Sequence, residues 1–396
     1  MATTTKRGES YRIRASCGYD AKGKQVTRSM TWKPELGMTA KQIEKELKRQ
    51  AVLFEEKCSG EGWGGNVKFE AFAKQWLEEY AEKQLRIRTV AIYRQFETRT
   101  YAAIGHIRLD KLTIRHVQSF INNLGEDGIN KNTGGKLSPK TVKNYLSFVS
   151  SVCSYAVRMG MIKSNPCERV RLPSMAKKEK ECYTVEEAQR FLESLQDVPE
   201  KYHAFFVLAI YGGFRKGELL GLEWSDLDFD NCIVTISRTS LYTKEKGVFT
   251  DTTKTQSSRR VLKLPEAVFS VLRAFRRAQS IERLRLGDQW KDSNRLFVDA
   301  LGAPMGNGTP YHWLERHCEA TGQRFLGVHM FRHLNASLLI NSGIDARTIA
   351  SSLGHSQVST TLNIYAHTFA EAQARAGEAV ADALALGSKK AAPGTA

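Results

Sequence analysis

The sequence predicts a multidomain chain: a small ββ(β)α unit, then an all-α module, then a mixed α/β, mainly helical C-terminal domain. Residues 1–65 begin with the period-two alternation of strands and end in helical periodicity. Residues 67–165 keep the helical period throughout, whereas helices and short strand patterns are mixed from residue 182 onward. The Gly-rich residues 59–66 and the Pro- and Lys-rich residues 166–181 are typical of linkers between these parts.

Composition excludes several classes of protein. Of the 396 residues, 41% are hydrophobic, which suffices for buried cores. The chain has neither an apolar run of transmembrane length nor an apolar signal-peptide core, which predicts a cytoplasmic protein that does not bind membranes. The 7 cysteines lack CxxC spacing, so we expect reduced thiols rather than a disulfide framework or a zinc ribbon.

The net charge of +17 is unevenly distributed along the chain. Residues 1–65 carry 13 Lys and Arg against 8 Asp and Glu, and residues 66–181 carry 21 against 11. Residues 182–396 are nearly balanced, with 25 against 23. A localised excess predicts a surface for a polyanion, most often nucleic acid, although charge alone is also consistent with a merely solvated basic surface.

The N-terminal unit is expected to contain a β-hairpin and one helix. Residues 11–17 and 25–32 have strand patterns, and residues 18–24 form the turn between them. Thr39 and Gln42 form a capping-box pattern at the start of the helix. A basic sheet of this kind is one way to enter a DNA groove, although many small units do nothing of the kind. The candidate DNA-contacting side chains are Arg12, Arg14 and Arg28.

Four amphipathic helices are expected between residues 67 and 165. Ser138 and Pro139 fit a helix N-cap followed by proline at the first helical position. The apolar and aromatic residues are most simply core, whereas the basic residues on the opposite faces suit a clamp on a duplex backbone. The candidate contacts here are Arg86, Arg88, Arg94, Lys140 and Lys143.

Helices and strands are mixed in the C-terminal domain. Thr184 and Glu187 predict a capped helix, and Asp345 predicts the start of a short helix that ends at Leu353, with Gly354 as its stop. Residues 387–396 are expected to be disordered. Strands are expected at residues 232–237, 241–249 and 260–264, and further helices at 202–211, 266–283, 309–320, 328–341 and 369–386.

The HMFRH motif at residues 329–333 concentrates side chains of chemical interest. His329 and Arg332 are three residues apart, so they share one face of a helix. The two histidines have the step of a zinc-protease motif, but Met330 stands where that motif needs a glutamate, so we expect no metal. Ligand spacing is likewise absent among His312, His317 and Cys318.

Two basic residues upstream complete the set of candidates. Arg215 follows two glycines that end a buried helix, a position equally typical of a helix-cap arginine paired with Glu218. Lys254 lies in a Thr-Lys-Thr stretch between two predicted strands, where most lysines are ordinary surface residues.

In order, the motifs GFRKGEL, TKT, HMFRH, LGH and NIYAH resemble the catalytic motifs of the tyrosine recombinases, or phage-type integrases. The pattern is most similar to integrases of conjugative transposons and temperate phages. Tyr365 follows His355 by ten residues, one more than in many members, and this longer spacing is familiar among conjugative-transposon integrases. The resemblance implies an arm-type DNA-binding domain (1–65), a helical core-binding domain (66–170), a linker (171–181), a catalytic domain (182–370), and a C-terminal helix and tail (371–396).

The resemblance also implies roles for individual residues. Tyr365 becomes the nucleophile that forms a 3′-phosphotyrosyl intermediate, and Glu218 supports Arg215. Two guanidiniums suit the non-bridging phosphate oxygens, and a tyrosine with an ordinary pKa of about 10 needs help to lose its proton. Lys254 would protonate the leaving 5′-oxygen, His329 would assist Tyr365, and His355 would hydrogen-bond the phosphate. The implied catalytic set is Arg215, Lys254, His329, Arg332, His355 and Tyr365, with no cofactor and no metal.

The implied partners are double-stranded DNA attachment sites, of core and arm type, and three further copies of the chain in a tetramer. The resemblance leaves open whether an excisionase or a host DNA-bending protein takes part. A type IB topoisomerase, which shares the chemistry, is the first alternative. A DNA-binding regulator with a decayed catalytic domain is the second, and the presence of all six expected residues argues against it.

Overall fold

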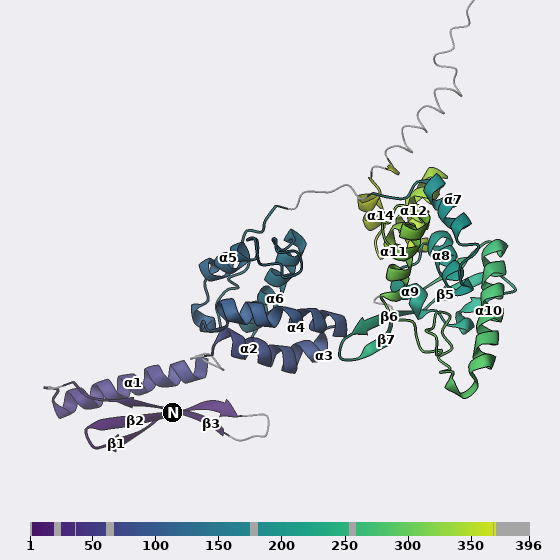
Figure 1. Cartoon of the computed structure of the whole chain (residues 1–396). Helices are drawn as coiled ribbons and strands as arrows, with labels where there is room; N and C mark the ends of the chain where they lie inside the picture. Colours follow the sequence, from purple (N-terminus) through teal and green to yellow (C-terminus); the bar gives the residue numbers. More distant parts are fainter. Residues whose placement is uncertain are drawn as a thin grey trace, which may run out of the picture. The chain divides into compact units, whose positions relative to one another are not determined.

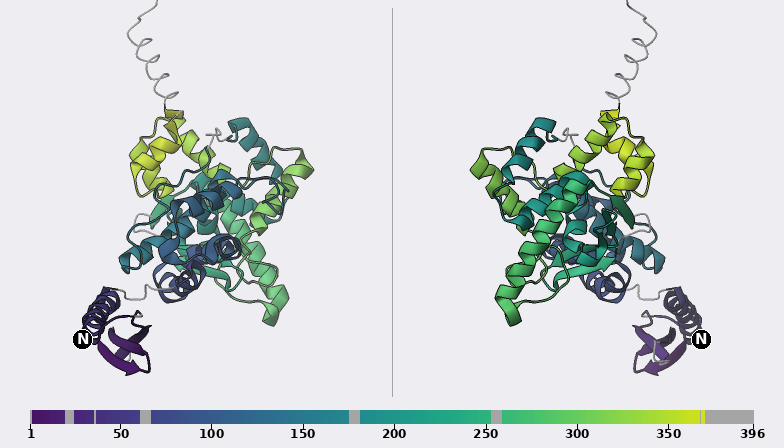
Figure 2. Two further views of the ribbon diagram at one scale, coloured as in Figure 1. Left: turned by 90° about the vertical axis from the view of Figure 1, so that its left-hand side faces the viewer. Right: turned by 90° about the vertical axis from the view of Figure 1, so that its right-hand side faces the viewer.

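The computed structural model describes residues 2–19, 25–35, 37–60, 67–174, 181–252, 259–366 and 368–369. The chain divides into two compact units, Met1–Lys177 and Lys178–Ala396. The first unit contains a three-stranded sheet with one long helix, and a helical module (Figure 1). The second unit is mainly helical and also contains two small antiparallel sheets (Figure 2).

A sheet with the strand order β1-β2-β3 opens the chain and is followed by one helix. The long helix packs against the central strand, where Ile13 and Ala15 are almost fully buried. The backbone N–H of Thr39 donates to Oε1 of Gln42, as the capping-box pattern predicts. The first strand was not expected because all of its residues are exposed and carry no alternation. The elements are β1 (Thr3–Arg7), β2 (Ser10–Tyr19), β3 (Gln25–Trp32) and α1 (Ala40–Gly60).

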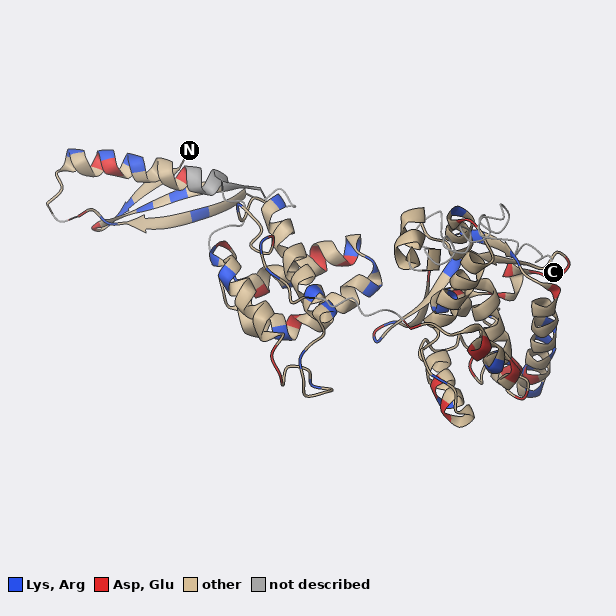
Figure 3. Ribbon diagram, turned by 90° about the horizontal axis from the view of Figure 1, so that it is seen from above, with Lys and Arg blue, Asp and Glu red and all other residues tan. Residues whose placement is uncertain are grey.

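The three candidate arginines of this sheet lie on different faces. Ile13 and Ala15 face α1, so Arg12 and Arg14 project from the opposite, open face. Arg28 pairs directly with Ala15 and therefore lies on the same side of the sheet as α1. Figure 3 shows Lys and Arg positions distributed along these strands. The prediction that these arginines contact DNA stays a prediction, and Arg28 does not share the open face with Arg12 and Arg14.

Residues 67–174 form a helical module, as expected. Two of its helices continue into π-helical turns, which lengthen them without a break. Thr113 accepts a hydrogen bond from the backbone of His116, and Ser138 caps the last helix with Pro139 in its first turn. The elements are α2 (Phe69–Trp76), η1 (Leu77–Ala81), α3 (Glu82–Gln84), α4 (Ile87–Thr100), η2 (Tyr101–Gly105), η3 (Leu109–Lys111), α5 (Ile114–Asn123) and α6 (Pro139–Arg158).

Aromatic side chains fill the core of this module. The ring centroids of Phe96 and Tyr145 lie 4.2 Å apart, and those of Trp76 and Tyr80 lie 6.3 Å apart. Phe148 is fully buried among them. These aromatic residues are therefore core, as the sequence indicates. Lys and Arg residues are spread over the helices of the module (Figure 3).

The second unit is mainly helical, and its most apolar helix lies at its centre. α8 packs against α9, α10 and α12, and both Phe205 and Phe206 are fully buried. Thr184 and Glu187 form the predicted reciprocal capping box. The helices are α7 (Val185–Ser194), α8 (Glu200–Gly212), α9 (Lys216–Gly221), α10 (Glu266–Leu286), α11 (Thr309–Thr321), α12 (His329–Asn341), α13 (Ala346–Leu353) and α14 (Val358–Ile364), with the 3₁₀ turns η4 (Trp224–Asp226) and η6 (Gly287–Gln289).

Two small sheets accompany these helices. Their strands are all antiparallel, in the orders β4-β5-β8 and β6-β7. The single strand predicted over residues 241–249 is wrong: a turn at residues 244–246 splits it into a hairpin. The backbone N–H of Lys246 donates to Oγ1 of Thr243 in that turn, and Gly247 has a φ of +64°. The strands are β4 (Leu227–Asp228), β5 (Ile233–Ile236), β6 (Arg238–Thr243), β7 (Gly247–Thr252) and β8 (Arg260–Lys263).

The end of the described chain contains the predicted short helix and one that was not predicted. Asp345 accepts from the backbone N–H groups of α13, and Gly354 ends the helix, as expected. α14 follows, and it was not expected. The helix predicted over residues 369–386 lies outside the described residues except for Phe369, as does the tail 387–396. Among the helices that are described, none combines the length and apolar character needed to cross a membrane.

Candidate active site

Arg215 stands at the junction between α8 and α9. α8 ends because Gly213 has a φ of +58°, and a Cβ at this position would lie 2.6 Å from Oδ1 of Asn335. Arg215 is the N-cap of α9, and Glu218 in the first turn accepts both from its backbone N–H at 2.9 Å and from its Nη1 at 2.8 Å. One carboxylate therefore satisfies an exposed helix donor and holds the guanidinium in place.

α12 brings a second arginine to the same turn. Arg332 is only 2% exposed. Its Nη1 donates to the carbonyl oxygen of Gly213 at 2.9 Å, and its Nη2 donates to that of Leu353 at 2.6 Å. His329 begins the same helix and is exposed. Arg332 thus joins the end of α8 to the end of α13, two segments far apart in the sequence.

The turn after α13 carries the third group. Gly354 has a φ of +66°, and its carbonyl oxygen accepts from Nη2 of Arg215 at 3.1 Å. The carbonyl oxygen of Leu353 accepts from Nη1 of Arg215 at 3.4 Å in addition to its bond from Arg332. His355 follows, and its Nδ1 lies 2.8 Å from Oγ1 of Thr361. Both guanidiniums therefore converge on the backbone that leads directly into His355.

The fourth residue of the site, Tyr365, lies at the end of α14. It is 5% exposed, and burial raises its pKa to about 12, although the charge of Arg332 opposes that rise. Its ring packs edge-on against that of His333, with centroids 5.5 Å apart. The side chains buried with it are Ala336, Ile340, Ile349 and Leu353.

Burial, and after it the positive charge of the neighbouring arginines, sets the protonation of the residues in this site. Burial, followed by the charge of Arg215, lowers the pKa of Arg332 to about 9, so Arg332 is still charged at pH 7. Burial, followed by the charges of Arg332 and Arg215, lowers the pKa of His355 to about 4. His355 is therefore a neutral imidazole at pH 7, with one ring nitrogen as donor and one as acceptor.

Two residues near this site were not assigned by the sequence analysis. Arg260, on β8, is 9% exposed, and its Nη2 donates to Oε2 of Glu218 at 2.8 Å. His333 lies between His329 and Tyr365, with ring centroids 5.1 Å and 5.5 Å from theirs. The four-residue step from His329 to His333 was visible in the sequence, but only as a zinc-motif spacing. No local pattern pointed to Arg260.

The remaining sequence candidates are not among the described residues of this site. Lys254 belongs to residues 253–258, which lie outside the described residues. Within the described ranges, no group of three His, Cys, Asp or Glu side chains is placed to hold a metal ion. His317 instead pairs its Nε2 with Oγ of Ser194 at 2.8 Å, and Cys318 is buried.

The candidate DNA contacts of the helical module differ in their availability. Arg88, Lys140 and Lys143 are exposed, and Arg86 is half-buried. Arg94 forms ion pairs with Glu82 and Glu97, so a phosphate would have to compete with two carboxylates for it. The exposed members are therefore the better candidates for a phosphate contact.

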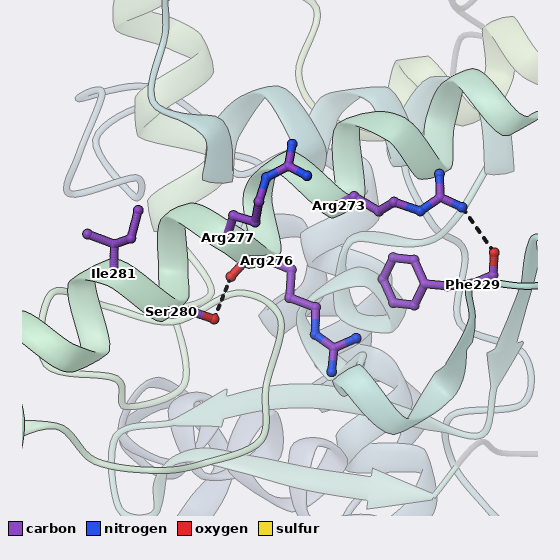
Figure 4. A pocket seen from close by; sticks show the side chains of 6 residues that line it. All are labelled: Phe229, Arg273, Arg276, Arg277, Ser280 and Ile281. Atoms are coloured by element: carbon purple, nitrogen blue, oxygen red, sulfur yellow. Dashed lines mark hydrogen bonds between the residues drawn. The ribbon is translucent and has the colours of Figure 1, made fainter.

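A shallow pocket on α10 is distinct from this site (Figure 4). Its volume is about 680 Å³, and none of the candidate catalytic residues lines it. Nη2 of Arg273 donates to the carbonyl oxygen of Phe229, and the guanidinium of Arg276 lies 5.4 Å from the Phe229 ring centroid. α8 packs against α10 on one side and α12 on the other (Figure 1), so the pocket is separated from Arg332.

Known proteins match both parts of the chain. Residues 181–372 match the Phage integrase family, and residues 68–172 match the Phage integrase SAM-like domain. A tyrosine recombinase XerC-like protein of Caldanaerobacter subterraneus subsp. tengcongensis is 27% identical over 399 residues, which cover 94% of this chain and 96% of that protein. The chain belongs to the tyrosine recombinase family. It is therefore a DNA breaking and rejoining enzyme.

Relatives from mobile elements are also similar to this recombinase. The ICEBs1 integrase of Bacillus subtilis is 26% identical over 276 residues, which cover 70% of this chain and 72% of that protein. The Tn1549 transposon integrase, solved in complex with transposon right end DNA, has a TM-score of 0.65 and 22% identity over 79% of this chain and 100% of its own. A lambda integrase dimer on a core site has a TM-score of 0.53 and 16% identity over 91% and 93%. The expected fold class is confirmed.

Proposed function

We propose that this recombinase integrates and excises a mobile element, and that Tyr365 is the nucleophile that cleaves the DNA. The observation that carries this proposal is the convergence of Arg215, Arg332 and His355 on one backbone turn, with Tyr365 packed beside them. The three groups proposed to stabilise the phosphate therefore belong to the same folded unit as Tyr365, which packs against Leu353. We propose that residues 182–370, which lie within the unit Lys178–Ala396, are the catalytic domain.

The proposed reaction is a transesterification. Oη of Tyr365 forms a bond to the scissile phosphorus, and the bond from phosphorus to the 5′-oxygen breaks. The phenolic proton leaves with a base, and a proton from an acid reaches the 5′-oxygen. The product is a 3′-phosphotyrosyl bond and a free 5′-hydroxyl, so the bond energy is conserved. Attack by a 5′-hydroxyl from a second duplex reverses the chemistry and joins the recombinant strand.

The two arginines are proposed to neutralise the charge on the non-bridging oxygens. The side chain of Arg215 is 38% exposed, so this guanidinium has donors left for a ligand. Arg332 is buried and held by two carbonyl oxygens, which makes its position rigid. Donors that are held before the substrate arrives need no reorganisation during the reaction, and this is the source of their effect.

Proton transfer is assigned to groups on either side of the phosphate. Because burial raises the pKa of Tyr365 to about 12, the phenol needs a general base. We assign this role to His329. Its ring centroid lies 5.1 Å from that of His333, and the ring centroid of His333 lies 5.5 Å from that of Tyr365. Lys254 is proposed as the acid for the 5′-oxygen. His355, neutral at pH 7, is proposed to donate a hydrogen bond to the phosphate.

The rest of the chain is proposed to bring DNA to this site. The helical module is assigned to core-site DNA through Arg88, Lys140 and Lys143, and the N-terminal sheet to arm-site DNA through Arg12 and Arg14. Lambda integrase has been solved as a tetramer bound to a Holliday junction. We propose the same assembly for this recombinase, with strands exchanged in pairs. Excisionase and DNA-bending proteins are candidate accessory partners.

The nucleophile is tested with a nicked duplex that carries the element's end, so that the cleaved strand fragment is lost and the covalent adduct accumulates. Wild-type protein should form a protein–DNA adduct that survives denaturing electrophoresis, and Tyr365→Phe should form none while still binding the duplex. Adduct formation by the phenylalanine variant would show that another residue attacks. Relaxation of supercoiled DNA without recombination between two sites would instead favour the topoisomerase alternative.

A further inference from the structure

Arg260 is a buried arginine with partners on two different parts of the active site. Its side chain is 6% exposed. Its Nε donates to the carbonyl oxygen of Ser352 at 2.6 Å, and its Nη2 donates to Oε2 of Glu218 at 2.8 Å. The guanidinium lies 5.7 Å from the ring centroid of Phe214. The guanidinium of Arg260 therefore extends from β8 and bonds both α9 and the end of α13.

Each partner of Arg260 is directly linked to a group of the proposed phosphate site. Oε2 of Glu218, which accepts from Arg260, also accepts from the backbone N–H of Arg215, and Oε1 accepts from Nη1 of Arg215. Ser352 precedes Leu353, whose carbonyl oxygen accepts from Arg215 and Arg332. The contacts of Arg260 thus reach both sides of the turn on which the two other arginines converge.

The charge balance at Glu218 depends on Arg260. Burial raises the pKa of the Glu218 carboxyl, but the hydrogen bond and charge of Arg260, together with the charge of Arg215, outweigh burial and lower the pKa overall. The carboxylate accordingly stays ionised inside the protein. An ionised Glu218 is what orients Arg215.

The buried position of Arg260 is costly, which argues against a purely structural role. Its Nη1 is buried and has no hydrogen-bond partner among the described residues. Gly354 provides the space, because a Cβ at that position would lie 2.8 Å from this nitrogen. Apolar side chains of similar volume often stabilise a fold as well as a buried ion pair does. The guanidinium of Arg260 leaves one buried donor, Nη1, without a partner in the described part of the chain. Its other two nitrogens donate to two acceptors at once, Ser352 and Glu218, which an apolar side chain could not do.

We propose that Arg260 is a positioning residue for DNA cleavage: it sets the distance between the Arg215–Glu218 pair and the Ser352–His355 turn. It touches neither the phosphate nor Tyr365, and it acts through Glu218 and the carbonyl oxygen of Ser352. A misplacement of about 1 Å in such groups costs about 100-fold in rate. This inference rests on the proposed role of Arg215.

The test compares Arg260→Lys with Arg259→Lys, which changes the exposed neighbouring arginine. Lysine keeps the positive charge near Glu218 but cannot reach both acceptors in a planar fork. At saturating protein, the rate of adduct formation on the nicked duplex should fall about 100-fold for Arg260→Lys and stay unchanged for Arg259→Lys. The dissociation constant for DNA should be the same for both. Arg260→Gln, which can satisfy only one acceptor, tests the same claim if the lysine variant melts below the assay temperature.

A second substrate separates positioning from simple loss of folded protein. In a methylphosphonate duplex, one charged oxygen of the scissile phosphate is replaced by a methyl group, so the alignment of Arg215 matters less. The rate ratio between wild type and Arg260→Lys should be much smaller on this duplex than on the phosphodiester. An equal ratio on both duplexes, or a wild-type rate for Arg260→Lys, overturns the inference. The proposed function fails separately, if wild type forms no adduct or Tyr365→Phe does.

Discussion

The helical module and the C-terminal unit both carry many basic residues, but they use them in opposite ways. Residues 66–181 have 21 Lys and Arg against 11 Asp and Glu, and members such as Lys140 and Lys143 are exposed. Residues 182–396 have 25 against 23, and yet Arg332 is 2% exposed and hydrogen-bonded to two carbonyl oxygens. The helical module therefore has an excess of positive charge and presents exposed basic side chains. The C-terminal unit has almost no excess of positive charge, but it holds Arg332 in a fixed position.

We therefore expect the exposed lysines of the module to affect DNA affinity, and the buried arginines of the C-terminal unit to affect the rate of cleavage. Exposed lysines contribute to DNA binding by releasing counterions, an effect that depends on their number and on salt. In the proposed mechanism, the buried Arg332 contributes to cleavage because it is in place before charge develops on the phosphate, an effect that depends on geometry. The two regions should therefore respond to substitution in different measurements.

Among substitutions that leave Tyr365 in place, the largest effect is expected from Arg332→Lys. Lysine cannot bind both the Gly213 and Leu353 carbonyl oxygens in one plane, so the rate of adduct formation at saturating protein should fall about 100- to 1,000-fold. Binding of the uncleaved duplex should change little. Arg347→Lys, which changes an exposed arginine of α13, is the control. A wild-type cleavage rate for a folded Arg332→Lys protein would remove Arg332 from the site.

The opposite result, a change in DNA binding with no change in the cleavage rate, is expected from Lys140→Gln combined with Lys143→Gln. The slope of log affinity against log salt should become shallower by about two, one for each lost phosphate contact. Cleavage at saturating protein should keep its wild-type rate. Fluorescence anisotropy at several salt concentrations measures the slope, with Lys263→Gln as an exposed lysine outside the module. An unchanged slope would mean that this face of α6 does not meet DNA.

The two faces of the N-terminal sheet should differ in the same assay. Arg12→Gln with Arg14→Gln should reduce the salt dependence of binding to arm-site DNA by about two. Arg28→Gln should leave it unchanged, because Arg28 lies on the face that carries α1. Equal losses from both sets would show that the sheet does not present its open face to DNA.

The smallest effect is expected from the protonation of His355. Its pKa is about 4 in the folded protein and about 6.5 in the unfolded chain, so unfolding takes up a proton between these values. The stabilising contribution is therefore present above pH 6.5 and is lost as the pH falls toward 4. The melting temperature of wild type should approach that of His355→Gln between pH 7 and pH 5, in a buffer without phosphate. A constant difference would show that His355 does not titrate in this way.

Features that depend on neighbours in the sequence were predicted well. The capping box of Thr184 and Glu187, the cap at Asp345 and the stop at Gly354 are all present, because each is decided within one helical turn. The α6 cap at Ser138 is a further case. The pairing of Arg215 with Glu218 likewise lies within three residues.

Features that depend on distant segments were missed or mistaken. Arg260 bonds residues 42 and 92 positions away in the sequence, and nothing in its own surroundings marks it. The hairpin of β6 and β7 is an exception, because its turn is local: the charged residues 244–246 and Gly247 are a turn signal that the prediction of one strand over residues 241–249 overlooked. β1 is exposed throughout, and only its pairing with β2 makes it a strand.

By itself, the sequence determined the family, the order of its parts, and which residue types are available for chemistry, because motifs, caps and composition are local properties of the chain. Only the tertiary structure decided that Arg215 and Arg332 meet on the carbonyl oxygen of Leu353, and that Arg260 holds Glu218 from the other side. These contacts join three segments of the chain. They exist because the buried donors and acceptors of those segments must satisfy one another in the same core.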